Sequence, residues 1–236
     1  MFESIYKHCI VPKNFLIASK YWVGLLYLSS LCILGYTFND VFYHVPHDHK
    51  QGIVSHIMYI HVPVAILSLS IYISLAILSA IYWVWQIKMA DVASVALAYI
   101  GFVTTCLTLI TGAIWGKPTW GTWWLWDARM TSEAILLLLY AAFLIIRFIL
   151  QPVSYAKRMA AIFATIGLID VPLVHYSVEW WYTLHQGPSL SLFEKPKIAW
   201  VMLMPLGGAF IGVIMLTAGL VLHAMRIVVK YNHKIE

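Results

Sequence analysis

Tryptophan is concentrated in one short segment of the chain, WGKPTWGTWWLWDARMTSE, which begins at Trp115 and ends at Glu133. On a helix whose first turn holds Pro118, spacing of i, i+3, i+4 and i+7 would align four side chains on one face: Trp120, Trp123, Trp124 and Asp127. With Trp115 and Trp126 beside it, this aromatic face with its carboxylate predicts a platform for a large planar ligand. The alternative is a belt of tryptophans at the membrane surface, where the indole ring is favoured.

Histidines are the second group of residues able to do chemistry. Seven of the ten lie in or beside three polar segments between long apolar stretches: His44, His47, His49, His56, His61, His175 and His185. A neutral imidazole binds iron well, and two imidazoles on opposite faces of a porphyrin make a six-coordinate haem iron. His61, in MYIHVP, and His185, in HYSVEWWYTLHQGP, are candidate ligands, with Lys117 or Arg129 available to the propionates. For any single histidine, the alternative is a hydrogen-bonded residue at the membrane interface.

His175 is the main rival of His185, because it lies only ten residues before it. We expect it to hydrogen-bond Asp170 or Glu179, although a ligand role stays open. Asp170 and Glu133 are expected at the ends of apolar stretches, where water or a partner side chain satisfies them.

The HVPHDH segment gathers His44, His47 and His49 around Asp48. Imidazole suits both zinc and copper, so this cluster is a second candidate metal site. The alternative is an exposed loop that is merely polar.

A very apolar chain must position these groups. Of its 236 residues, 62% are hydrophobic and 11% are charged, whereas a soluble domain is roughly half apolar and a quarter charged. The mean hydropathy is +0.82. A water-soluble globule of this size cannot cover so much apolar surface, which excludes a soluble enzyme and a disordered tail. The net charge of +5 comes without a basic run, so a nucleic-acid partner is also excluded.

Six apolar stretches are long enough to cross about 30 Å of hydrocarbon as helices of roughly 20 residues. Their expected limits are 21–39, 57–85, 92–115, 131–151, 157–175 and 199–227. The stretches are uniformly apolar rather than alternating, so barrel strands are not expected. The expected fold is all-α: a single integral-membrane domain, residues 1–236, with six transmembrane helices.

The positive charges give the expected orientation. One set of loops and ends carries ten Lys and Arg residues and the other set carries five. Because the richer side faces the cytoplasm, both termini are expected there, and the tryptophan and histidine segments on the outer side. The first stretch is followed by FNDVFYHVPHDH, which has no small-residue cleavage site, so we expect a retained anchor.

Few polar residues lie inside the spans, and each has a structural interpretation. Four threonines can return hydrogen bonds to their own helix: Thr104, Thr105, Thr108 and Thr111. Three glycines are expected at helix contacts: Gly207, Gly208 and Gly212. The chain has no P-loop for ATP and no CxxCH for covalent haem. We therefore expect no enzyme activity of its own and energy coupling only through a partner.

Three motifs together, WGTWWLWDARMTSE, IHVP and VHYSVEWWYTLHQG, resemble the haem-handling protein C (CcmC) family of the bacterial cytochrome c maturation system. The tryptophan-rich part resembles the signature of the wider haem-handling family, and the short chain and histidine motifs favour this member. The resemblance covers nearly the whole chain, including the six spans and the order of the outer motifs.

The resemblance implies that the chain binds haem b non-covalently at the periplasmic face of the inner membrane. Carried onto this sequence, the axial ligands are His61 and His185. The tryptophan platform and chaperone-facing surface are then Trp115, Trp120, Trp123, Trp124, Trp126 and Asp127. The implied partners are a membrane-anchored periplasmic haem chaperone, an ABC transporter membrane subunit with its ATPase subunit, and a small single-span subunit. The chaperone becomes covalently attached to the haem, and the transporter drives its release.

Two other functions compete with this one. A haem-permeating transporter subunit needs an internal path of histidines or small residues, whereas the histidines here cluster outside the spans. A scaffold that only docks the transporter and the chaperone would use the tryptophans as a protein-binding surface and would bind no haem.

Overall fold

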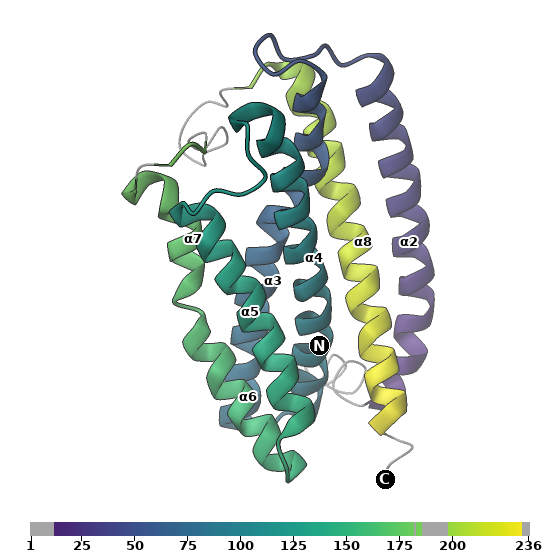
Figure 1. Cartoon of the computed structure of the whole chain (residues 1–236). Coiled ribbons are helices and arrows are strands. Elements are labelled where there is room, and N and C mark those ends of the chain that lie inside the picture. The colour runs from purple at the N-terminus through teal and green to yellow at the C-terminus, as the bar shows by residue number, and fades with distance from the viewer. Residues whose placement is uncertain (1–11, 182, 186–197, 233–236) are drawn as a thin grey trace.

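The computed structural model describes residues 12–181, 183–185 and 198–232. Within them the secondary structure is helical, without a strand: α2 (Pro12–Tyr43), the 3-10 helix η2 (Ile53–Ile57), α3 (Met58–Trp85), α4 (Lys88–Trp120), α5 (Ala128–Ile149), α6 (Val153–Gly167), α7 (Asp170–Trp180) and α8 (Trp200–Asn232). These helices form an upright bundle in which α2 begins and α8 ends at the same end (Figure 1).

Six helical segments of the described chain are long and apolar enough to cross a membrane. They correspond one to one with the six expected spans, so the all-α multi-span prediction is confirmed. The fifth segment is broken between α6 and α7, where the amides of Leu168 and Ile169 bond the carbonyls three residues back. Pro172 follows and has no N–H to return to Leu168, which favours a tightened backbone at this point.

The main core lies between α3, α4, α5 and α6. Leu75, Leu136 and Tyr140 are fully buried there, and the α6 side of the contact is made by Ala160 and Ala164. Small residues let the helices approach closely. The same four helices form the scaffold that carries the tryptophan segment at one end of the bundle (Figure 1).

An ion-pair cluster joins α4, α5 and α6 at the opposite end of the bundle. Asp91 Oδ2 lies 3.2 Å from Arg147 Nη2 and 3.0 Å from Lys157 Nζ. The carboxylate is buried, so both cations stabilise a charge that water does not reach.

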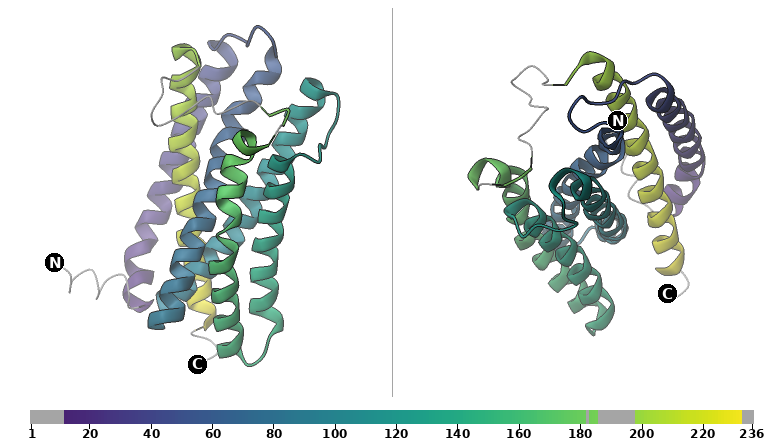
Figure 2. Two further views of the ribbon diagram at one scale, coloured as in Figure 1. Left: turned by 90° about the vertical axis from the view of Figure 1, so that its left-hand side faces the viewer. Right: turned by 45° about the horizontal axis from the view of Figure 1, so that its top comes forward.

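Helix α2 packs chiefly against α8, to one side of the other helices (Figure 2). The Ser30 hydroxyl donates to the Gly212 carbonyl at 2.9 Å, and a Cβ at Gly208 would lie 2.5 Å from Thr37 Oγ1. Gly208 and Gly212 therefore are contact positions, as expected. Gly207 is not, because a Cβ there would meet open space.

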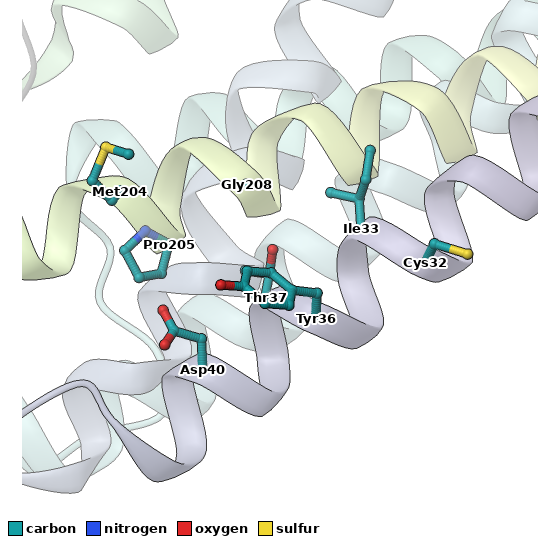
Figure 3. A pocket seen from close by; sticks show the side chains of 8 residues that line it. All are labelled: Cys32, Ile33, Tyr36, Thr37, Asp40, Met204, Pro205 and Gly208. Atoms are coloured by element: carbon teal, nitrogen blue, oxygen red, sulfur yellow. The ribbon is translucent and has the colours of Figure 1, made fainter.

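A cavity of about 410 Å³ lies between the two helices (Figure 3). Its lining residues are Cys32, Ile33, Tyr36, Thr37, Asp40, Met204, Pro205 and Gly208.

Candidate functional site

The tryptophan segment is not one continuous helix. Gly121 adopts φ 80°, a left-handed conformation that glycine tolerates, and α4 ends at Trp120. The side chain of Asp127 then accepts the Met130 amide at 2.9 Å and starts α5. The expected helical face of Trp120, Trp123, Trp124 and Asp127 is therefore wrong. Pro118 lies in the last turn of α4 rather than in a first turn.

The five tryptophans fall into two groups as a result. Trp115 and Trp120 project from the last turns of α4 and are partly buried. Trp123 and Trp126 belong to the connection and are 58% and 84% exposed. Trp124 packs edge-on against Trp126, with ring centroids 5.4 Å apart.

His61, on α3, is held by the end of α4. Its Nδ1 lies 3.0 Å from Thr111 Oγ1, and its ring meets Trp115 edge-on at 5.6 Å. The single hydroxyl proton of Thr111 goes to the Leu107 carbonyl at 2.6 Å, so the oxygen accepts from His61 Nδ1–H. Hydrogen-bond geometry thus assigns the proton to Nδ1 and leaves the Nε2 lone pair free.

Gly112 provides the space for this imidazole. A Cβ at that position would lie 3.1 Å from His61 Cε1, tighter than an ordinary contact. The absence of a side chain on this turn of α4 therefore lets the ring of His61 pack against the helix.

His185 follows α7 and is held by the start of α5. Its Nδ1 lies 2.8 Å from Asp127 Oδ2, and its ring meets Trp120 edge-on at 4.6 Å. A carboxylate only accepts, so the proton is on Nδ1 here too, and the Nε2 lone pair carries no proton. Burial lowers the pKa of His185, and the neighbouring Asp127 carboxylate offsets only part of that shift. The neutral imidazole, the form that binds metals, is therefore favoured.

The two imidazoles share one end of the bundle. They interact electrostatically with each other, and Arg129 interacts with both. Among the described residues neither Nε2 has a hydrogen-bond partner, and neither is a fully buried unpaired atom. Within the described residues both Nε2 lone pairs are therefore available to a ligand.

The loop between α2 and η2 supports the same region. The Trp115 indole N–H donates to Gln51 Oε1 at 2.9 Å. Asp48 Oδ1 accepts the amides of Lys50 and Gln51 at 2.8 and 2.9 Å, which closes the loop into a tight turn. Gln51 and Thr111 were not candidates in the sequence, since neither carries a local signal of its distant partner.

The HVPHDH segment does not form a three-ligand cluster in the described part of the chain. His47 Nδ1 lies 3.2 Å from His56 Nε2, and His44 Nδ1 lies 3.3 Å from Asp40 Oδ1. His44 and His47 thus pair with neighbours outside the cluster.

His175 is exposed, and its ring packs against Tyr176 at 4.6 Å. Within the described residues its imidazole has no hydrogen bond to Asp170 or Glu179, and Asp170 Oδ2 is buried without a partner. Arg129, a candidate for the propionates, donates instead to the carbonyls of Val174 and His175.

The other propionate candidate, Lys117, has a local partner: its Nζ donates to the Gly121 carbonyl at 3.0 Å. Glu133 and Asp170 are only 6% and 3% exposed, so water does not satisfy them. A partner side chain, the other expected solution, is present for Glu133, whereas Asp170 Oδ2 has none among the described residues. Glu133 Oε1 accepts from the Ser68 hydroxyl at 2.9 Å.

The fold and the six spans define a multi-pass helical membrane protein with two imidazoles gathered at one end. The family model described as heme exporter protein C matches residues 5–235. The chain therefore belongs to the heme exporter protein C family, whose members handle haem in cytochrome c maturation.

Individual relatives agree with this assignment. The protein named heme exporter protein C from Escherichia coli (strain K12) is 41% identical over 226 residues, which cover 96% of this chain and 91% of that protein. Its namesake from Haemophilus influenzae is 48% identical over 161 residues, 68% of this chain and 65% of its own. A putative cytochrome c biosynthesis ccmC-like mitochondrial protein of Marchantia polymorpha is 43% identical over 148 residues, 63% and 62% of the two chains. These names describe transport and biogenesis rather than a catalysed reaction.

Proposed function

We propose that the chain receives haem b at the periplasmic face of the bacterial inner membrane and hands it to a membrane-anchored haem chaperone. The axial ligands are His61 and His185. The observation that carries the proposal is the shared state of these two imidazoles: each Nδ1 is engaged by an acceptor, and each Nε2 has no partner in the part of the chain that the structure describes. Haem is the cargo of this site, and its iron needs two such lone pairs.

In this proposal the tryptophans have different roles, because some lie beside the ligand histidines and others are exposed. Trp115 and Trp120 pack against the two ligand rings and cover the porphyrin. Trp124 offers an indole N–H that is buried and unpaired among the described residues, so it can donate to a haem carboxylate. The exposed Trp123 and Trp126 then form the surface that meets the chaperone.

In this proposal the chain positions haem for its covalent attachment to the chaperone and supplies no nucleophile of its own. Holding haem with one edge toward the chaperone raises the effective concentration of the two reactants. An ABC transporter membrane subunit, its ATPase subunit and a small single-span subunit complete the assembly in this proposal and release the loaded chaperone.

The orientation is part of the same proposal. The end where α5 meets α6 and α8 ends faces the cytoplasm with both termini, and the tryptophan segment faces the periplasm. By their places in these helices, Arg147, Lys157 and Arg226 lie toward the cytoplasmic end. An alkaline phosphatase fusion is expected to be active after Gly121 and inactive at the C-terminus. The reverse pattern would overturn the orientation.

The proposed haem site is tested by the absorption spectrum of the purified protein, oxidised and reduced, after co-expression with the chaperone. We expect a low-spin bis-histidine spectrum that His61→Ala and His185→Ala both weaken or alter. His223→Ala is the matched control, since His223 pairs with Tyr27 at 3.2 Å between α8 and α2, away from the site. A wild-type protein that binds the chaperone without haem would support the scaffold function instead.

A further inference from the structure

We propose that the two iron ligands are unequal: His185 is the strong ligand, and His61 is the weak one whose bond to iron opens first. This inference rests on the proposed function, because it concerns the same haem site. It follows from the different acceptors that the structure places behind the two imidazoles.

The acceptor behind His185 is an anion. Asp127 Oδ2 takes the Nδ1 proton at 2.8 Å, and a charge-assisted bond of this kind is about twice as strong as a neutral one. Pulling on the Nδ1 proton raises electron density at Nε2 and makes the imidazole a better donor to iron.

The acceptor behind His61 is neutral and already engaged. Thr111 Oγ1 donates its proton to the Leu107 carbonyl at 2.6 Å and accepts from His61 at 3.0 Å. A hydroxyl oxygen carries no net charge, so it polarises Nδ1–H much less than a carboxylate does. Nε2 of His61 is therefore the poorer donor of the pair.

The difference in donor strength between the two imidazoles determines which iron–histidine bond opens first during haem transfer. When the Fe–His61 bond opens, the electron pair stays on Nε2 and the proton stays on Nδ1. No proton or electron has to move, and iron gains one free position while His185 keeps hold of the haem. A ligand from the recipient can then take that position. Thr111 and Asp127 thus act as positioning residues that make one bond labile and the other durable.

Carbon monoxide reports which ligand leaves, because it replaces one axial ligand of ferrous haem. The sample is the full chain loaded with haem and reduced with dithionite, and the readout is the Fe–CO stretching frequency. That frequency depends on the ligand opposite CO. The wild-type adduct is expected to match that of His61→Gly, in which His185 remains, and to differ from that of His185→Gly.

A wild-type adduct that matches His185→Gly, or an equal mixture of both, overturns the inference while the haem site stands. Absence of haem from the wild-type protein overturns the proposed function itself. The two failures are therefore distinguishable.

A milder variant keeps the test decisive if the glycine variants do not fold. Thr111→Val removes the hydroxyl acceptor of His61 with little change of shape, so CO should bind about 2- to 10-fold more tightly as it competes with a weaker His61. Thr111→Ser should restore the wild-type affinity. Thr119→Val is the matched control, because Thr119 makes the same bond to its own helix, at 2.6 Å to the Trp115 carbonyl, and is exposed. An unchanged CO affinity in Thr111→Val would overturn the inference.

Discussion

Replacing Asp127 by Asn separates its two roles, the cap of helix α5 and the hydrogen-bond acceptor of His185. Asp127 Oδ1 accepts the Met130 amide at 2.9 Å, and Oδ2 accepts from His185 Nδ1 at 2.8 Å. Asparagine has one oxygen for these two bonds. Because Asn caps a helix about as well as Asp, that oxygen stays with Met130, and the amide NH2 group then faces His185.

Two donors cannot share a hydrogen bond, so the imidazole of His185 must move its proton to Nε2, the nitrogen proposed to bind iron. The lost interaction is a hydrogen bond to a charged group, about 1.5–3 kcal/mol, which corresponds to about 10- to 150-fold in affinity. Removing a partner of a metal-ligating histidine typically costs 10- to 100-fold, in the same range. We expect haem affinity of Asp127→Asn to fall by roughly 10- to 100-fold.

The assay is a titration of the haem-free protein in detergent with ferric haem, followed by absorbance. Asp40→Asn is the matched control, because Asp40 pairs with the exposed His44 at 3.3 Å, outside the proposed site. Thermal unfolding of the haem-free proteins checks that the cap is kept, and both variants should unfold close to the wild type. Wild-type affinity and an unchanged low-spin spectrum in Asp127→Asn would refute the reasoning.

Four further variants probe other parts of the structure. Gly112→Val should reduce haem affinity about 5- to 150-fold, since overpacking against His61 costs about 1–3 kcal/mol. Haem affinity equal to that of the wild type would mean that the ring can shift freely. Asp91→Asn should destabilise the protein by about 3–5 kcal/mol, because two partly buried cations lose their carboxylate. The measurement is the temperature of thermal unfolding, which should fall; an unchanged unfolding temperature would contradict this. Trp126→Ala should slow haem transfer to the chaperone more than it lowers the haem content of the protein. Trp120→Ala should lower the haem content more than it slows transfer. Equal effects of the two variants would reject the division between exposed and partly buried tryptophans.

The spans could be predicted because hydropathy alone determines them: each needs only a continuous apolar run, and six runs became six helical segments. The threonines of α4 also behave as expected, since Thr104, Thr105 and Thr108 donate to carbonyls three or four residues back. Local rules are sufficient for features of this kind.

The arrangement of the site needed information that local rules do not contain. Helical spacing favoured one aromatic face, but Gly121 ends the helix, and that glycine was a visible stop signal. The contact between His61 and Thr111 spans 50 residues of sequence, and the contact between Asp127 and His185 spans 58. Such pairs are determined by how the helices pack, so a single sequence does not reveal them.

The pairing of α2 with α8 has a consequence for biosynthesis. The Ser30–Gly212 hydrogen bond joins positions 182 residues apart, so the first span enters the membrane long before its partner exists. At about 5–20 residues per second, the ribosome needs roughly 10–35 s to cover that distance. Throughout this interval α2 lies in lipid without its partner, while α3 and α4, which carry His61 and Thr111, are synthesised and completed. Assembly therefore ends when α8 packs against α2. A chain that stops before α8 would contain His61 and His185, but its first helix would have no packing partner.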